Sequence, residues 1–206
     1  MSIKPVGTPP TPSLRQARKI FVRNHICEAA RDLFFVQGYA ATTFDQIARA
    51  AGTRRTTLYS HFADKAEILS AIGEAYYDGL CRIVEELPGP TPSRAEIDAW
   101  IDTLVRFVER ERTPASLMIG LGVGKDTPPA VERLSQRFRD ALSARLPAFA
   151  HADRPGPDFP LRQAWKRVVL RELSFGCLEA AHLPEEGQPM LTVAADLFER
   201  FIRENG

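Results

Sequence analysis

One stretch decides the fold of this 206-residue chain: residues 38–69, which read GYAATTFDQIARAAGTRRTTLYSHFADKAEIL. Thr43 and Gln46 have the spacing of a capping box, in which two side chains bond backbone N–H groups at a helix start. Gly52 provides a position where φ can be positive, so the chain can turn sharply there. Two short helices joined by such a glycine-containing turn form a helix-turn-helix.

The second helix of this motif is expected from Arg54 to about His61, with Thr53 as its cap. Leu58 would hold it against the first helix, and Asp64 would open a third helix through another capping box. The first turns of the second helix carry arginine and threonine and nothing acidic. Arginine pairs with guanine and threonine contacts base edges in the major groove, so we interpret this as a recognition helix.

The candidate DNA-binding residues follow from this interpretation. Base contacts are expected from the start of the recognition helix. Phosphate contacts, which fix register, are expected from the residues around it and from the start of the third helix. The full set is Thr42, Thr43, Thr53, Arg54, Arg55, Thr56, Thr57, Tyr59, Ser60, His61 and Lys65.

This stretch resembles the DNA-binding domain of the TetR family of transcriptional regulators. The resemblance covers about residues 18–70, and it departs from the family pattern at the turn. Thr53 and Arg54 stand there in place of the usual aliphatic residue and serine, so either could occupy the position where serine is common. The matching residues are Gly38, Tyr39, Thr42, Thr43, Ile47, Ala48, Ala51, Gly52, Thr57, Leu58, Tyr59, His61, Phe62, Lys65 and Leu69.

The resemblance implies a ligand-responsive regulator. A homodimer would bind a palindromic operator on double-stranded DNA, and a small molecule would enter the C-terminal helical domain. The ligand would then favour a spacing of the two recognition helices that does not match successive major grooves, which lie about 34–36 Å apart. A repressor is the expected outcome, and an activator of the same fold is the alternative.

Charge and cysteine content agree with this interpretation without requiring it. Residues 1–70 carry a net charge of +5 and residues 71–206 carry −4, so the basic part coincides with the proposed DNA-binding region. The modest size of this imbalance is also compatible with chance. Cys27, Cys81 and Cys177 are too few and too far apart for a disulfide framework, which favours a reducing, cytoplasmic location. Cys81 and Cys177 are either redox sensors or, more commonly for free cysteine, small buried side chains.

The rest of the chain predicts an all-α protein with three parts. Residues 1–13 are rich in proline and are expected to form a disordered arm, which is either inert or lies along a DNA groove. Residues 14–63 would form the DNA-binding domain, and residues 64–206 an effector-binding and dimerisation domain. Helices are expected at about 14–37, 64–86, 161–182 and 190–204, among others, and residues 147–160 are expected to form a proline-rich loop.

Two sets of apolar residues are candidates for binding in the second domain. A cavity of aromatic side chains and methionine would suit a bulky hydrophobic effector, although ordinary core packing is the alternative for each residue: Trp100, Leu104, Phe107, Met118, Phe138 and Trp165. The last two helices would pair with a second copy, unless they only complete the core of one chain. Their candidate dimer residues are Val169, Leu173, Gly176, Ala180, Ala194, Phe198 and Phe201.

Nothing in the sequence predicts catalysis. The four histidines do not form a metal-binding pair, and no nucleophile-elbow sequence G-x-S-x-G occurs. We therefore expect no enzyme activity, no metal and no cofactor. The competing hypothesis from another class is a helical small-molecule-binding protein or enzyme that uses its N-terminal motif for protein interaction.

Overall fold

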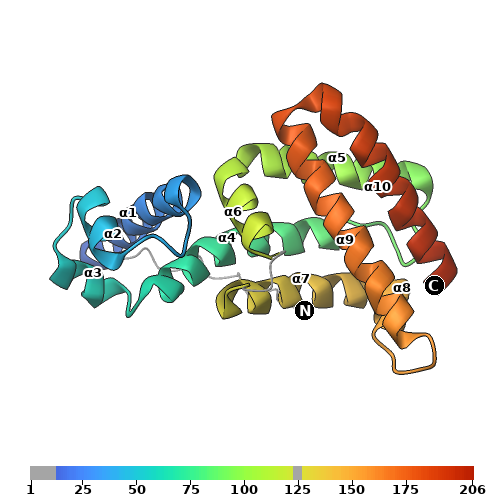
Figure 1. The fold of residues 1–206 in the computed structure, drawn as a ribbon, viewed down its shortest axis with the longest axis horizontal. Coiled ribbons are helices and arrows are strands. Elements are labelled where there is room, and N and C mark those ends of the chain that lie inside the picture. Colours follow the sequence, from blue (N-terminus) through green and yellow to red (C-terminus); the bar gives the residue numbers. More distant parts are fainter. Residues whose placement is uncertain (1–12, 123–126) are drawn as a thin grey trace, which may run out of the picture.

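The structure, a computed structural model, describes residues 13–122 and 127–206 and contains only α-helices in those ranges, so the all-α prediction is confirmed. The expected arm lies outside the described residues, apart from Ser13. Figure 1 shows α1–α3 at one end of an elongated molecule and α5 and α8–α10 at the other. The helices are α1 Leu14–Gln37, α2 Phe44–Ala50, α3 Arg55–His61, α4 Lys65–Glu85, α5 Arg94–Arg110, α6 Arg112–Gly122, α7 Pro129–Arg145, α8 Pro147–Ala152, α9 Phe159–His182 and α10 Pro184–Asn205.

Local signals set the boundaries of the first three helices. Ser13 opens α1 with a capping box, and Thr43 opens α2 with the one expected from the sequence. Gly38 and Gly52 adopt φ values of +86° and +56° at the two connections, a region that side-chain-bearing residues rarely adopt. The sequence left the cap of α3 open between Thr53 and Arg54; in the structure Arg54 is the N-cap, and it makes no side-chain capping bond.

Helices α1–α3 share a small core. Ile26 and Phe34 from α1, Ile47 from α2 and Leu58 from α3 are all buried. Leu58 is the only fully buried residue of α3. The short recognition helix is therefore held through one side, and the rest of its surface stays accessible.

Two helices connect this N-terminal unit to the remainder of the described chain. The Asp64 side chain accepts a bond from the Glu67 N–H and starts α4, which then runs through the middle of the molecule (Figure 1). Helix α6 packs against α1 as well as against α4, α7 and α9. The sequence predicted the α4 link, whereas the contact between α6 and α1 depends on tertiary structure.

The C-terminal helices form a bundle with an aromatic centre. Helix α9 packs most extensively against α10 and also contacts α5, while α7 packs on α4. The ring of Phe198 lies 5.3 Å from Trp100 and 5.8 Å from Phe149, and Phe201 lies 4.8 Å from Phe149. Burial of these aromatic faces supplies much of the hydrophobic stabilisation at this end.

Prolines begin helices here where the sequence suggested loops. The expected loop at residues 147–160 contains α8, which starts at Pro147. Helix α10 starts at Pro184 and not near residue 190, and it continues through Pro189. Proline is tolerated in the first helical turn, because the N–H it lacks would have no helical partner there. Over the described ranges, no helix is both long and apolar enough to cross a bilayer.

Candidate nucleic-acid interface and ligand cavity

The recognition helix α3 presents a polar, basic surface. Arg54, Arg55, Thr56, Tyr59 and Ser60 are exposed. Thr43 is exposed at the start of α2, while Thr53, Thr57 and His61 are partly buried. This surface contains donors suited to base edges and phosphates, as the sequence suggested.

The two arginines at the start of α3 differ in the contacts that their side chains make. Arg55 Nη1 donates to Asp45 Oδ2 at 3.0 Å, and Arg55 Nη2 donates to the Tyr59 hydroxyl at 3.3 Å. The Tyr59 ring in turn packs 4.8 Å from Phe44. Arg54 makes no side-chain hydrogen bond or ion pair with any described residue. Arg55 is therefore restrained across α2 and α3, whereas Arg54 is available to an outside partner.

Two predicted phosphate contacts are structural instead. The Thr42 side chain is only 1% exposed; its hydroxyl donates to the Gly38 carbonyl at 2.8 Å and accepts from Gln37 at 3.1 Å. Lys65 Nζ donates to three backbone carbonyls, those of Tyr39 at 2.7 Å, Thr42 at 2.9 Å and Ala40 at 3.2 Å. All three ammonium donors of Lys65 are thus used within the chain. The prediction that Thr42 and Lys65 contact phosphates is therefore corrected: both side chains support the connection between α1 and α2.

His61 lies at the junction of α1, α3 and α4. Its carbonyl accepts a bond of 2.8 Å from Arg23 Nη1, and Arg23 also stacks over Phe62 and faces Glu67. Burial, assisted by the charges of Lys19 and Arg23, lowers the pKa of the His61 imidazole. His61 is therefore neutral at physiological pH and adds no positive charge to the interface.

A groove of about 820 Å³ lies among α4, α7 and α9, with α5 and α6 contributing to its floor. Leu104, Met118 and Phe138 line it, as the sequence predicted. Trp100, Phe107 and Trp165 do not. Trp100 donates to the Ile83 carbonyl and stacks on Phe198, Phe107 fills the space beside Gly79, and Trp165 packs edge-on against Phe201. These three side chains belong to the core, which was the alternative interpretation.

Polar residues of the groove were missed at the sequence level. The Tyr77 hydroxyl and Ser135 Oγ lie 2.8 Å apart in it, and Lys166, only 4% exposed, bonds both carboxylate oxygens of Asp153 at 2.7 and 2.8 Å. The available signal was Lys166 itself. Lys166 shares helical spacing with Val169 and Leu173, the buried stripe of α9, and a charge on that stripe requires a partner.

The seven predicted dimer residues are buried within their own chain, all but Gly176 at 4% exposure or less. They hold α9 against α10 and the core, so they cannot form the surface that meets a second copy. The prediction that is corrected placed these seven residues in the dimer interface: Val169, Leu173, Gly176, Ala180, Ala194, Phe198 and Phe201. The large apolar residues exposed on these helices are different: Phe159, Leu161 and Val168 on α9, and Met190 and Val193 on α10, the last two 41% and 58% exposed.

The cysteines lie in environments that disfavour thiolate chemistry. Burial raises the pKa of Cys177 to about 12 and of Cys27 to about 11, and it also raises the pKa of Cys81. A reactive cysteine requires a lowered pKa, so these thiols fit the packing role and not the sensor role. Among the residues that the structure describes, no group of three histidine, cysteine or acidic side chains is placed to bind a metal.

Comparison with known proteins places the N-terminal unit in a family. Residues 26–72 match the family of bacterial regulatory proteins of the tetR type. The regulator TcmR of Streptomyces glaucescens is 40% identical over 109 residues, which are 51% of this chain and 47% of TcmR. The chain spans about half or less of the length of the first curated relatives it matches.

Solved structures share the whole fold at low identity. NalD, the secondary repressor of the MexAB-OprM multidrug efflux pump in Pseudomonas aeruginosa, is 19% identical with a TM-score of 0.57; the match covers 91% of this chain and 96% of NalD. The SmeT–triclosan complex gives 23% identity and a TM-score of 0.53, covering 84% and 90%. The N-terminal unit therefore matches the tetR family of bacterial regulatory proteins, and the helical architecture as a whole is similar to that of solved TetR-type structures.

Proposed function

We propose that this protein is a ligand-responsive transcriptional repressor that binds a palindromic operator as a homodimer. The observation that carries the proposal is the exposed surface of α3 inside the matched DNA-binding unit, with Arg54 at its leading end unpaired by any described side chain. Arginine at the start of a recognition helix suits bidentate bonding to guanine, and the neighbouring threonines suit base edges.

Release from DNA is proposed to begin in the groove. Met118, Ile119 and Gly122 of α6 line the groove, and α6 also packs on α1. Tyr76 and Tyr77 place α4 in the same wall. A ligand with different affinities for two arrangements of α6 and α4 would shift the position of α1–α3, since it acts only through that difference in affinity. The bound triclosan in the related SmeT structure supports a ligand-binding role for this fold.

The DNA-binding proposal is tested by fluorescence anisotropy. The probes are duplexes selected from random DNA by the wild-type protein and the DNA flanking its own gene. Arg54→Ala should weaken binding about 10- to 100-fold, because a lost bidentate contact costs about 1–3 kcal/mol. Rising NaCl should weaken wild-type binding steeply, because phosphate contacts release counterions.

The matched control is Arg133→Ala on α7, an exposed arginine far along the chain from α3. It should bind the selected duplex as wild type does. Full binding by Arg54→Ala, or a wild-type protein that ignores duplex DNA at low salt, would refute the assignment. Transcription from the selected operator with and without the protein then separates repression from activation.

A further inference from the structure

We infer that the ligand of the groove is an amphipathic anion. Its apolar body would lie on the floor of the groove, and its acidic group would be held at the rim by Arg167. This inference rests on the proposed function only in taking the groove to be the effector site. It changes the expected ligand from a purely hydrophobic compound to one that carries a negative charge.

The floor of the groove is apolar. Leu80 of α4, Leu104 and Val108 of α5, Met118 of α6 and Leu173 of α9 line it. A volume of about 820 Å³ lies within the range of about 300–1,000 Å³ that is typical of small-molecule sites. The inner part of the groove therefore suits an uncharged hydrocarbon or aromatic body.

The rim is richer in positive than in negative charge. Helix α9 contributes exposed Arg167 and Arg171, and α7 contributes partly exposed Arg139, whereas Lys166 lines the groove as a buried residue. Among the described residues that line the same space, the acidic ones are Glu132 and Asp153. An apolar floor beneath a positive rim matches a molecule with a hydrophobic body and an anionic end.

The ion pairs identify the cation that remains available. Lys166 is neutralised by Asp153 at 2.7 Å. Arg139 pairs with Glu132 at 2.6 Å, and Arg171 pairs with Glu172 at 2.8 Å. Their lining neighbour Arg167 makes no hydrogen bond or ion pair with any residue that the structure describes.

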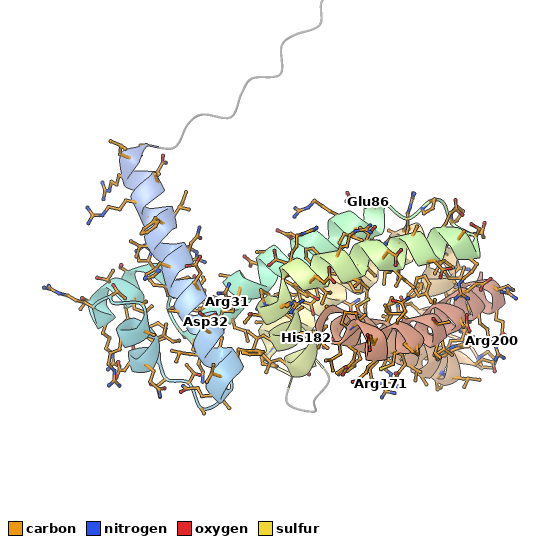
Figure 2. All side chains as sticks on the ribbon, turned by 90° about the horizontal axis from the view of Figure 1, so that it is seen from above. Arg31, Asp32, Glu86, Arg171, His182 and Arg200 are labelled. Carbon is orange, nitrogen blue, oxygen red and sulfur yellow. The ribbon has the colours of Figure 1, made fainter. Side chains whose placement is uncertain are left out.

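The helical spacing strengthens the assignment of Arg167. Arg167 and Arg171 are four residues apart on the same face of α9, and of the two only Arg171 has an acidic partner among the described residues, Glu172. A bound carboxylate would supply the partner that Arg167 lacks among the described residues. It would also use the planar donor fork of the guanidinium, which matches a carboxylate in two parallel hydrogen bonds. Figure 2 shows Arg171 at the edge of the molecule and not in its interior.

The test compares three probes with one hydrocarbon tail and different ends: dodecanoate, dodecanol and dodecyltrimethylammonium. Each is titrated into the full-length protein below its micelle concentration and followed by isothermal titration calorimetry. Dodecanoate should bind at least about tenfold more tightly than dodecyltrimethylammonium. Arg167→Gln should weaken dodecanoate binding about tenfold and leave dodecanol binding unchanged, and salt should weaken only the dodecanoate complex.

Arg133→Gln is the matched control, because Arg133 is an exposed arginine of α7 that does not line the groove. It should bind dodecanoate as wild type does. Equal affinity for the three probes, no binding of dodecanoate, or full dodecanoate affinity in Arg167→Gln would overturn the inference. Operator binding is measured separately on the same preparations. Retained DNA binding without dodecanoate binding refutes the ligand class alone, whereas loss of wild-type DNA binding refutes the proposed function.

Discussion

Lys65 stabilises the fold where three backbone carbonyls of the α1–α2 connection converge. Lys65→Met would leave the carbonyls of Tyr39, Ala40 and Thr42 without their donor. We predict that the free energy of unfolding falls by about 1–3 kcal/mol, the cost of unsatisfied groups in a partly buried site. Chemical denaturation measures it, with Lys19→Met as the control, since exposed Lys19 should change stability by less than about 0.5 kcal/mol. Wild-type stability in Lys65→Met together with weakened DNA binding would restore Lys65 as a phosphate contact.

The Asp153–Lys166 pair predicts a pH-dependent contribution to stability. Burial by itself raises the pKa of Asp153, but hydrogen bonds from Lys166 and Gln163 outweigh it and lower the pKa overall. A lowered folded-state pKa stabilises the protein above the unfolded-state pKa of about 3.9, and this is lost as pH falls through the folded value. Asp153→Asn should therefore lower the melting temperature at neutral pH, and the difference from wild type should shrink below about pH 4.

Melting curves across pH check this prediction, with Asp102→Asn as the control. Asp102 is exposed on α5 and makes no ion pair or side-chain hydrogen bond within the described residues. Its substitution should leave the melting temperature close to that of wild type. A constant difference between Asp153→Asn and wild type from neutral to acid pH would contradict the proposed role of the pair.

At the residue scale, the sequence predicts which chemical groups a site contains better than it predicts which side chains those groups contact. Arg54 and Arg55 look equivalent in the chain, and only the structure shows that Asp45 and Tyr59 restrain Arg55. Thr42 and Lys65 match a DNA-binding motif, yet they serve the scaffold that presents α3. A motif records which residue types recur, and it does not separate contact with DNA from support of the helix that makes the contact.

At the element scale, the close approach of α9 and α10 depends on Gly187. A Cβ at this position would lie 2.2 Å from the Ala180 nitrogen and 2.4 Å from its Cα, both backbone atoms that cannot move aside. Gly187→Ala should therefore lower the free energy of unfolding by at least about 1–3 kcal/mol. Denaturant titration with circular dichroism measures the change, and a variant as stable as wild type would show that the helices do not pack this closely.

Gly120 in α6 supplies the opposite prediction as a control. A Cβ there meets nothing within 4 Å. Gly120→Ala should raise the free energy of unfolding by about 0.5–1 kcal/mol, because alanine loses less backbone entropy in a helix than glycine. The two substitutions make the same chemical change, so a difference of sign between them isolates the effect of packing.

Helix starts were predictable where side chains carry the signal. Thr43 caps α2 as expected from its spacing to Gln46, and Asp64 caps α4 as expected, accepting from the Glu67 N–H. The helix starts at prolines were not predicted, because Pro147 and Pro184 begin helices in the structure. A proline indicates that a helix cannot continue from the preceding residues, and whether one starts at that point depends on tertiary packing.

At the scale of the whole molecule, the class of fold was predictable and the surfaces were not. Helical periodicity without strand-like alternation predicts an all-α protein. It cannot say which side of a helix meets its own chain and which side meets a second one. The small and aromatic residues expected to form a dimer contact, such as Ala194 and Phe198, are buried by neighbouring helices.

An exposed apolar patch on the outer face of α10, beside α9, is the candidate surface for the proposed dimer. Glu172 of α9 lies beside Met190 and Val193 of α10 around a shallow depression. We propose that two copies meet here, in continuation of the proposed function. In a two-fold interface the same patch occurs on both sides, so one substituted residue appears twice. Val193→Glu would therefore place two unpaired charges in a contact that should bury more than about 1,000 Å².

Size-exclusion chromatography with light scattering distinguishes the outcomes. The wild-type protein should be a dimer at micromolar concentration, and Val193→Glu should be a monomer with an unchanged far-ultraviolet dichroism spectrum. Thr192→Glu is the control, because Thr192 is exposed on the other flank of α10 and should leave the dimer intact. Since one recognition helix reads only one half-site, Val193→Glu should also lose operator binding while keeping an intact α3. A monomeric wild-type protein, or a Val193→Glu variant that stays dimeric, would exclude this face as the interface.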